Sequence, residues 1–240
     1  PRRPDAFVGK MDPRVLRRAR AGYYGSITHI DHQINRFLEG LQEADAHANT
    51  YVCFVSDHGE MLGDHHLWRK GYPYEGSARV PLMLRGPGDG PVRRNAEIGE
   101  VIELRDVMPT LLDCAGLPIP SSVEGKSFLP LARGKRLPWR RHLHGELTLF
   151  NQSLQWLTDG KEKYVWFSGS GREQLFDLEA DPTELHDLVR DSPARVARWR
   201  KRLIKELRGR EEGFTDGRRL IRGRKVNAVL AHLRKAAGIA

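Results

Sequence analysis

Apolar side chains in the first fifth of the chain recur at helical spacing. The positions that share this spacing are Ile27, Ile30, Ile34, Phe37, Leu38 and Leu41. Steps of three and four place such residues on one face of a helix. The pattern therefore predicts an amphipathic helix from about Pro13 to Glu43 that packs on one side.

A continuous apolar run of strand length follows that helix. Residues 50–56 read TYVCFVS, with apolar or β-branched side chains at nearly every position. A strand without polar alternation is typical of a parallel sheet covered by helices on both faces. A helix leading into such a strand predicts an α/β fold with a doubly wound sheet.

Three further stretches complete this first part of the chain. Residues 80–88, VPLMLRGPG, form a second short apolar run that ends in a Gly-Pro-Gly turn. Residues 102–118 predict a short helix that ends at Gly116, with Pro118 just beyond it. Residues 118–138 are rich in proline and glycine, and we expect them to connect two domains.

The hydrophobic period changes beyond that connection. Short aromatic-rich runs, HLHGEL, LQWLTDG, KYVWFS and EQLFDLE, are separated by turn sequences such as TDGK and SGSG. This pattern predicts a small antiparallel meander. A helical tail follows from about Pro193. We therefore predict an α/β domain at 1–137, an antiparallel subdomain at 138–190 and a basic helical tail at 191–240.

Composition refines this picture chiefly through charge. The chain of 240 residues carries a net charge of +9, yet residues 190–240 alone hold 16 Lys or Arg against 5 Asp or Glu. Such a tail can contact nucleic acid, an anionic glycan or a membrane surface, but a solvated, partly amphipathic helix is favoured. The body is not basic, so nucleic acid is not expected as a partner. No apolar run approaches the roughly 18–20 residues that span a bilayer, so no membrane span is expected.

Candidate chemistry lies directly after the first predicted strand. Asp57 and His58 follow residues 50–56, and open α/β sheets bind ligands at the carboxyl ends of their strands. A carboxylate oxygen and an imidazole nitrogen suit a divalent cation, although Ca²⁺ takes about six to eight ligands and needs others. Alternatively, Asp57 caps the next turn and His58 is an ordinary loop residue.

The loop after this pair is rich in polar groups. Asp64, His65, His66 and Lys70 follow within thirteen residues. The ammonium group of a lysine near a dication can hold an oxygen of a sulfate or phosphate. The alternative is that Lys70 is a surface lysine.

Several motifs in this region resemble those of a known family. SDHGEMLGDHHLWRKG followed by YEGSARVPLMLRGPG is similar to the second signature region of the sulfatases, within the alkaline-phosphatase-like superfamily. YYGSITHIDHQINRFLEGL, DVMPTLLDCAGL and LFDLEADPTELHDL agree, in the family's order, over most of residues 15–190. The block PWRRHLHGEL to LQWLTDGKEKYVWF resembles bacterial arylsulfatases in particular.

The resemblance implies roles for individual residues. Asp57 matches the metal-binding aspartate of the family, and His58 matches the adjacent ligand, which is Asn or His in different members. Lys70 matches the lysine that contacts the sulfate group, and His65 lies where we expect structural support for the site. The implied metal is usually Ca²⁺, and the implied nucleophile is a formylglycine made from a C-x-P-S-R motif. The implied substrate is an aryl or carbohydrate sulfate ester.

The sequence departs from the family pattern in one respect. It contains neither a C-x-P-S-R or S-x-P-S-R motif nor the family's paired aspartates, so no residue of this chain is assigned as nucleophile. The resemblance places these groups in an N-terminal part, and we expect the 240 residues alone to be inactive. A phosphodiesterase or phosphonate hydrolase of the same superfamily, and a non-catalytic anion-binding module, are alternatives.

Half of a doubly wound sheet also exposes apolar surface. We expect the isolated chain to aggregate or to need a partner over that surface, and an oligomer stays open. The cellular location, periplasmic or cytoplasmic, is equally open, because any export signal would precede Pro1.

Overall fold

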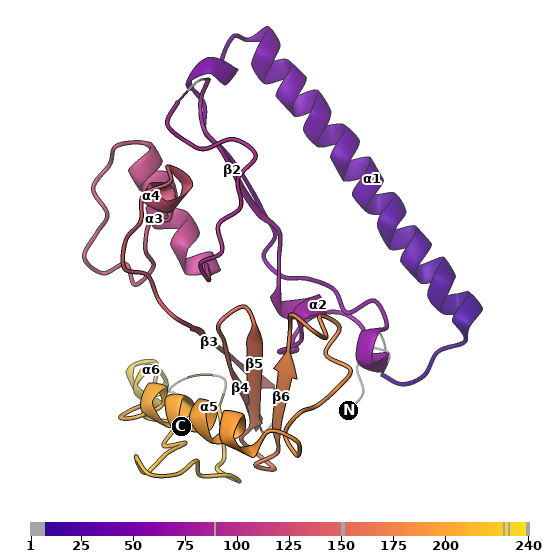
Figure 1. Ribbon diagram of the computed structural model, residues 1–240, viewed down its shortest axis with the longest axis vertical. Coiled ribbons are helices and arrows are strands. Elements are labelled where there is room, and N and C mark those ends of the chain that lie inside the picture. The colour runs from indigo at the N-terminus through magenta and orange to yellow at the C-terminus, as the bar shows by residue number, and fades with distance from the viewer. Residues whose placement is uncertain (1–7, 89, 150–151, 228, 230, 239–240) are drawn as a thin grey trace. The chain divides into compact units, whose positions relative to one another are not determined.

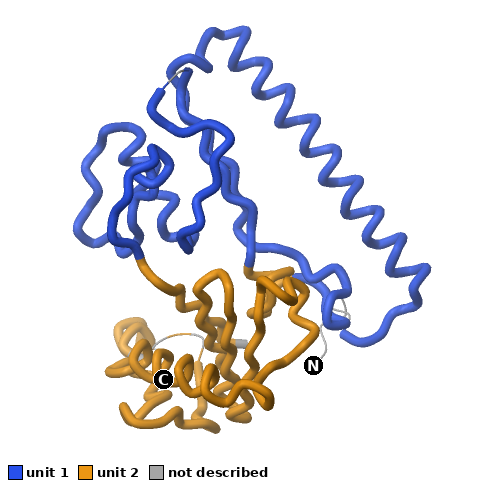
Figure 2. The backbone as a smooth tube through the Cα atoms, viewed as in Figure 1, with its two compact units in different colours: residues 1–69, 79–139 blue, residues 70–78, 140–240 orange. Residues whose placement is uncertain are grey.

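The computed structural model describes residues 8–88, 90–149, 152–227, 229 and 231–238. The chain forms two compact units, each built from two stretches of sequence (Figure 2). Unit 1 comprises residues 1–69 and 79–139, and unit 2 comprises residues 70–78 and 140–240. A nine-residue segment inside the sequence of unit 1 thus belongs to unit 2.

Unit 1 begins with the long helix α1, Pro13–Glu43, which is uninterrupted in Figure 1. Asp12 caps it by accepting a hydrogen bond from the Arg14 amide at 2.8 Å, and proline at the first helical position suits a helix start. The predicted helix is confirmed. Its apolar face is only partly covered by the described residues: none of α1 is buried, Ile34, Leu38 and Leu41 are half-buried, and Ile30 and Phe37 are exposed.

After the short 3₁₀ helix η1, His47–Asn49, strand β1, Val52–Val55, pairs antiparallel with β2, Leu82–Arg85. The predicted strand is confirmed, and among the described residues it exposes apolar surface, as expected for half of a doubly wound sheet. Within these residues β1 has β2 as its one neighbour, and the facing pair Phe54 and Met83 is exposed. The apolar composition is therefore not matched by burial.

The other regular elements described in unit 1 are short helices. They are η2, Asp64–His66, η3, Leu104–Asp106, α3, Val107–Cys114, and α4, Leu129–Ala132. The predicted helix before Gly116 is confirmed. The stretch expected to connect two domains is instead part of this unit, because Leu129 and Ala132 pack with Val92 in its core.

Unit 2 contains a four-stranded sheet. The strands are β3, Leu143–Leu149, β4, Gln152–Thr158, β5, Glu162–Phe167, and β6, Glu173–Asp177. They pair antiparallel in sequence order, which confirms the predicted meander. The short helix α2, Glu75–Ala78, comes from the inserted segment and also belongs to this unit.

Helix α5, Pro193–Glu206, begins where the helical tail was predicted to begin. It buries Trp199 and Leu203 in a core shared with Leu157, Trp166 and Phe214. The short helix α6, Ala231–Ala236, lies near the end of the chain. Across the described residues, no helix combines the length and apolar character that crossing a membrane requires.

The arginines of this basic region make ion pairs within the unit. Arg195 lies 2.7 Å from Glu162, Arg200 lies 2.6 Å from Glu173, and Arg210 pairs with Glu146 and Glu212. Arg195 and Arg200 of α5 therefore face acidic groups of the sheet in the same unit.

Candidate active site

Asp57 and His58 follow β1 after one residue, Ser56, near the carboxyl end of that strand, as the sequence predicted. The Asp57 carboxylate is 83% exposed, and its Oδ2 lies 3.5 Å from Nε2 of His58. Nδ1 of His58 lies 2.8 Å from the carbonyl oxygen of Gly59. Because a carbonyl oxygen only accepts, Nδ1 donates this hydrogen bond, and Nε2 lies on the side of Asp57.

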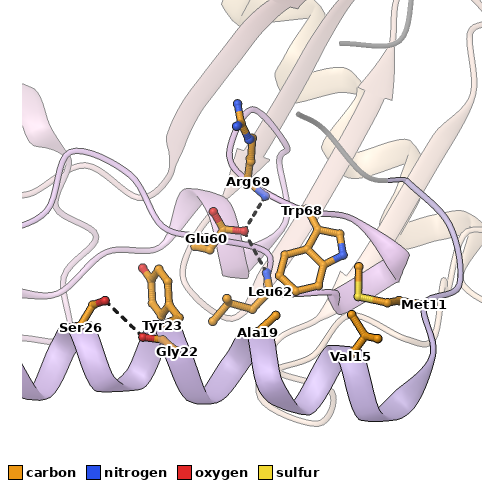
Figure 3. A pocket seen from close by; sticks show the side chains of 10 residues that line it. All are labelled: Met11, Val15, Ala19, Gly22, Tyr23, Ser26, Glu60, Leu62, Trp68 and Arg69. Atoms are coloured by element: carbon orange, nitrogen blue, oxygen red, sulfur yellow. Dashed lines mark hydrogen bonds between the residues drawn. The ribbon is translucent and has the colours of Figure 1, made fainter. Parts of the chain in front are cut away.

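The loop that follows, residues 60–69, is closed on itself by hydrogen bonds. The Met61 amide donates to the carbonyl oxygen of Arg69 at 3.0 Å, and the Gly63 amide donates to that of Leu67 at 2.8 Å. The Glu60 carboxylate accepts hydrogen bonds from the amides of Leu62 and Arg69 (Figure 3). Glu60 therefore braces both ends of the loop.

The backbone of this loop is strained. Leu62, His65, His66 and Arg69 all have positive φ angles, between 47° and 69°. Residues other than glycine seldom adopt this region, and such outliers gather at functional sites. His65, predicted to support the site, thus lies at a strained position inside η2.

Helix α1 holds the loop from one side. Nε of Arg20 donates to the carbonyl oxygen of Leu62 at 2.8 Å, and its Nη2 lies 2.8 Å from Oδ1 of Asp64. Between helix and loop lies an open cleft of about 450 Å³. Figure 3 shows Val15, Ala19 and Tyr23 projecting from one face of α1 toward Leu62 and Trp68.

Lys70, the predicted sulfate contact, is exposed and begins the inserted segment of unit 2. The amides of Gly71 and Tyr72 donate to the buried hydroxyl Oγ of Ser77, at 3.0 and 3.3 Å. The segment from Gly71 to Ser77 is therefore a closed loop, and Lys70 leads directly into it.

The predicted site residues belong to both units of the chain. Asp57 and His58 are in contact and share unit 1 with His65, whereas Lys70 belongs to unit 2. Among the described residues, no three His, Cys, Asp or Glu side chains are grouped as a metal site requires. Two ligands are fewer than a divalent cation needs, so the pair would hold a metal only with ligands from elsewhere.

Two family patterns match the chain. The sulfatase pattern matches residues 2–117, and the pattern described as N-sulphoglucosamine sulphohydrolase, C-terminal, matches residues 63–212. The chain belongs to the sulfatase family. The resemblance inferred from the motifs around Asp57 and Lys70 is thereby confirmed.

Individual relatives agree with this assignment. An arylsulfatase of Clostridium perfringens is 50% identical over 229 residues, which are 94% of this chain and 47% of that protein. A multifunctional alkaline phosphatase superfamily protein of Trinickia caryophylli is 36% identical over 237 residues, covering 85% of this chain and 45% of that protein. This sulfatase-family chain spans about half the length of these curated relatives or less.

A solved structure supports the fold. The phosphonate monoester hydrolase of Silicibacter pomeroyi superposes with a TM-score of 0.73 at 28% identity, over 82% of this chain and 43% of that one. The α/β fold class predicted for this chain, part of an alkaline-phosphatase-like sheet followed by an antiparallel subdomain, is confirmed.

Sequence reasoning missed the groups that hold the site in place. Arg20 and Glu60 brace the loop, and a buried lysine of β5, Lys163, pairs with Glu75 of the inserted segment. Lys163 carried no clear signal, because it follows Lys161 and Glu162 and stands just before the apolar run of its strand. Arg20 carried none, since its partners lie more than forty positions away.

Proposed function

We propose that this chain is the part of a sulfuric ester hydrolase that contributes Asp57 and His58 to a divalent cation and Lys70 to the sulfate group. The observation that carries the proposal is the contacting Asp57–His58 pair at the end of β1, in a segment matched by the sulfatase pattern. The substrate is an aryl or carbohydrate sulfate ester.

The residues present fit a divalent cation. The carboxylate of Asp57 is accessible, and the hydrogen bond from His58 Nδ1 to Gly59 orients the ring with Nε2 on the side of Asp57. A hydrogen bond of this kind at the second ring nitrogen is usual for histidines that bind metals. Ca²⁺, when bound, would polarise the sulfate group and stabilise the charge that develops on its oxygens.

The remaining groups have complementary tasks. The ammonium group of Lys70 would hold a sulfate oxygen, because its point charge offsets the negative charge of the ester. His65 would support the loop at its strained turn. The formylglycine nucleophile and further metal ligands would come from a segment with a C-x-P-S-R motif, which these 240 residues do not contain.

The experiment compares the chain alone with a hybrid enzyme. In this hybrid the chain is joined to the part of the Clostridium perfringens arylsulfatase that it does not match. We expect no turnover of an aryl sulfate by the chain alone and turnover by the hybrid. Asp57→Ala should lower kcat/KM of the hybrid about a hundredfold or more, as loss of a charge-stabilising group does.

Asp31→Ala, on the exposed surface of α1, is the matched control and should leave turnover unchanged. Turnover by the chain alone contradicts the need for a separate nucleophile. A folded hybrid without activity on sulfate esters contradicts the proposed reaction.

A second candidate is hydrolysis of phosphonate or phosphate diesters. The similarity to a phosphonate monoester hydrolase at 28% identity favours it, because that enzyme shares the fold of this chain. A panel of sulfate monoesters, phosphate diesters and phosphonate monoesters on the hybrid separates the two. A kcat/KM for phosphonates that exceeds the value for sulfates would assign the second activity.

A further inference from the structure

The inserted segment, residues 70–78, is attached to the sheet of unit 2 by side chains. The hydroxyl of Tyr74 donates to Oε1 of Gln174 at 2.9 Å, and its ring packs edge-on against Phe176, with centroids 6.1 Å apart. Both partners lie on β6. The segment is therefore bound to a surface more than ninety positions away in sequence.

A buried ion cluster lies at the centre of this attachment. Lys163 of β5 is 1% exposed, and its Nζ lies 2.7 Å from Oε1 of Glu75 and 2.8 Å from Oε1 of Glu184. The other oxygen of Glu184 accepts a hydrogen bond from the Glu75 amide at 2.6 Å. Residue 75 is thus held twice, by its side chain through Lys163 and by its backbone through Glu184.

A lysine in this position is costly unless it is paired. Removing an ammonium group from water is unfavourable, and only close carboxylates offset the loss. Burial raises the pKa of Glu184, although the ammonium group of Lys163 opposes that shift. Two carboxylates around one cation form a cluster that tolerates little displacement of any member.

The attachment is transmitted to Lys70 by the closed loop. Glu75 begins α2, and Ser77 of the same short helix accepts the amides of Gly71 and Tyr72. The Ser77 and Ala78 amides in turn donate to the carbonyl oxygen of Tyr74, at 2.9 and 2.8 Å. A change at Glu75 therefore moves the hydrogen bonds that orient the backbone next to Lys70.

We propose that Lys163 is a positioning residue for Lys70, acting through its buried contacts with Glu75 and Glu184. The inference rests on the proposed role of Lys70 in holding the sulfate group. It assigns to the antiparallel subdomain a part in the reaction, because β5 supplies the group that fixes the inserted segment.

The first test measures the attachment itself. Hydrogen exchange of the amides of Gly71, Tyr72, Ser77 and Ala78 is compared among the unmodified chain, Glu75→Gln and Lys163→Met. We expect exchange in both variants to accelerate about tenfold or more through local opening, while amides of β4 keep their protection. Glu75→Gln weakens the ion pair with Lys163 from the side of the inserted segment. It therefore tests the attachment even if Lys163→Met unfolds the sheet.

Lys161→Met is the matched control. Lys161 is two positions away, 69% exposed, and paired with Glu179 at 2.9 Å on the surface. It should leave exchange of residues 71–78 unchanged. Unchanged exchange in both Glu75→Gln and Lys163→Met overturns the proposal.

The second test asks whether the effect passes through Lys70. In the hybrid enzyme, Glu75→Gln is introduced with Lys70 intact and with Lys70→Ala, and kcat and KM are measured for an aryl sulfate. We expect Glu75→Gln to lower kcat/KM about tenfold with Lys70 present and less than about twofold with Lys70→Ala, since residues acting together are not additive.

Equal losses in both backgrounds show a structural role only and overturn the proposal. Faster exchange of residues 71–78 in a hybrid that hydrolyses phosphonates but no sulfates leaves the attachment standing and refutes the proposed substrate class. The two failures are thereby distinguished.

Discussion

At the scale of single residues, Gly125 of unit 1 lies very close to the backbone of Arg105. A Cβ atom at Gly125 would lie 1.8 Å from the carbonyl oxygen of Arg105. The neighbouring Lys126 amide donates to Oδ1 of Asp106, a fully buried carboxylate, at 2.8 Å. The approach of these two backbone stretches therefore requires a residue without a side chain.

We expect Gly125→Ala to destabilise unit 1 by about 1–3 kcal/mol, the usual cost of overpacking, because the backbone of Arg105 must move. Thermal unfolding measures the change. Gly99→Ala is the control, since a Cβ atom there has nothing within 4 Å. Equal melting temperatures for the two variants would show that the contact relaxes freely.

The carboxyl group of Glu162 makes the stability of unit 2 depend on pH. Burial raises the pKa of this carboxyl, but hydrogen bonds from Trp199, Arg198 and Arg195 lower it more, so the net pKa is below the usual value. A lowered pKa in the folded state contributes stability that is present above the unfolded-state pKa of about 4.3 and is lost as the pH falls through the folded-state pKa.

We expect Glu162→Gln to cost about 1–3 kcal/mol at neutral pH, the range for hydrogen bonds to a charged group. This difference from the unmodified chain should shrink as the pH falls below about 4. Urea unfolding at pH 7 and pH 3 measures it. A difference that stays constant with pH would mean that the charge of Glu162 does not contribute.

Residue identities at the candidate site were only partly predictable. Asp57 and His58 follow a strand directly in sequence, so their adjacency was foreseeable. The contacts of Arg20 with Leu62 and of Lys163 with Glu75 join residues 42 and 88 positions apart. Such pairs depend on tertiary packing, which local patterns do not contain.

At the scale of elements, the hydrophobic period predicted which helices and strands form better than it predicted how far they are buried. The helix from Pro13 to Glu43 was foreseen from its apolar stripe, and α5 starts at the proline that marked it. The strand at 50–56 was foreseen too, but its apolar run did not show which side chains, such as Phe54, are exposed. An apolar pattern shows which face of an element would gain stability from burial. Whether that face is buried depends on which other segment packs against it.

The exposed apolar stripe of α1 should affect how the chain associates in solution. Ile27, Ile30 and Phe37 present apolar side chains on one face, and contiguous patches of this kind promote association. We expect Ile30→Glu to reduce self-association of the chain without lowering its melting temperature, because Ile30 is not buried. Light scattering at several concentrations measures this.

His32→Glu serves as the control for added charge, since position 32 is exposed and lies on a different side of the helix from Ile30. It should reduce association less than Ile30→Glu. Equal effects would assign the change to net charge rather than to the stripe.

At the scale of the whole molecule, the four-stranded sheet was predicted from the change of the hydrophobic period, from helical to strand spacing, near residue 138. The exchange of residues 70–78 into unit 2 had no such signal, because their composition does not differ from that of their surroundings. Tyr74 and Glu75 contact Gln174, Glu184 and Lys163, which lie beyond position 160.

The discontinuous unit predicts an effect at long sequence distance. Leu203 is fully buried in the core between α5 and the sheet. We expect Leu203→Ala to cost about 2–5 kcal/mol in unit 2 and to release the amides of residues 71–78 along with those of the sheet. Hydrogen exchange resolved by peptide measures both.

Leu129→Ala, in the core of unit 1, is the matched substitution. It should release amides around α4 and leave residues 71–78 protected. Release of residues 71–78 by Leu129→Ala but not by Leu203→Ala would place the segment in unit 1.

The cluster of Glu75, Lys163 and Glu184 also constrains how such a chain can evolve. A substitution that removes the lysine leaves the buried carboxylate of Glu184 beside the half-buried one of Glu75, so we expect it to be tolerated only where an acidic partner is lost as well. Positions 75, 163 and 184 should therefore change jointly among sulfatases. The antiparallel subdomain and the short segment next to Lys70 should then change together in evolution, although more than sixty residues separate them in sequence.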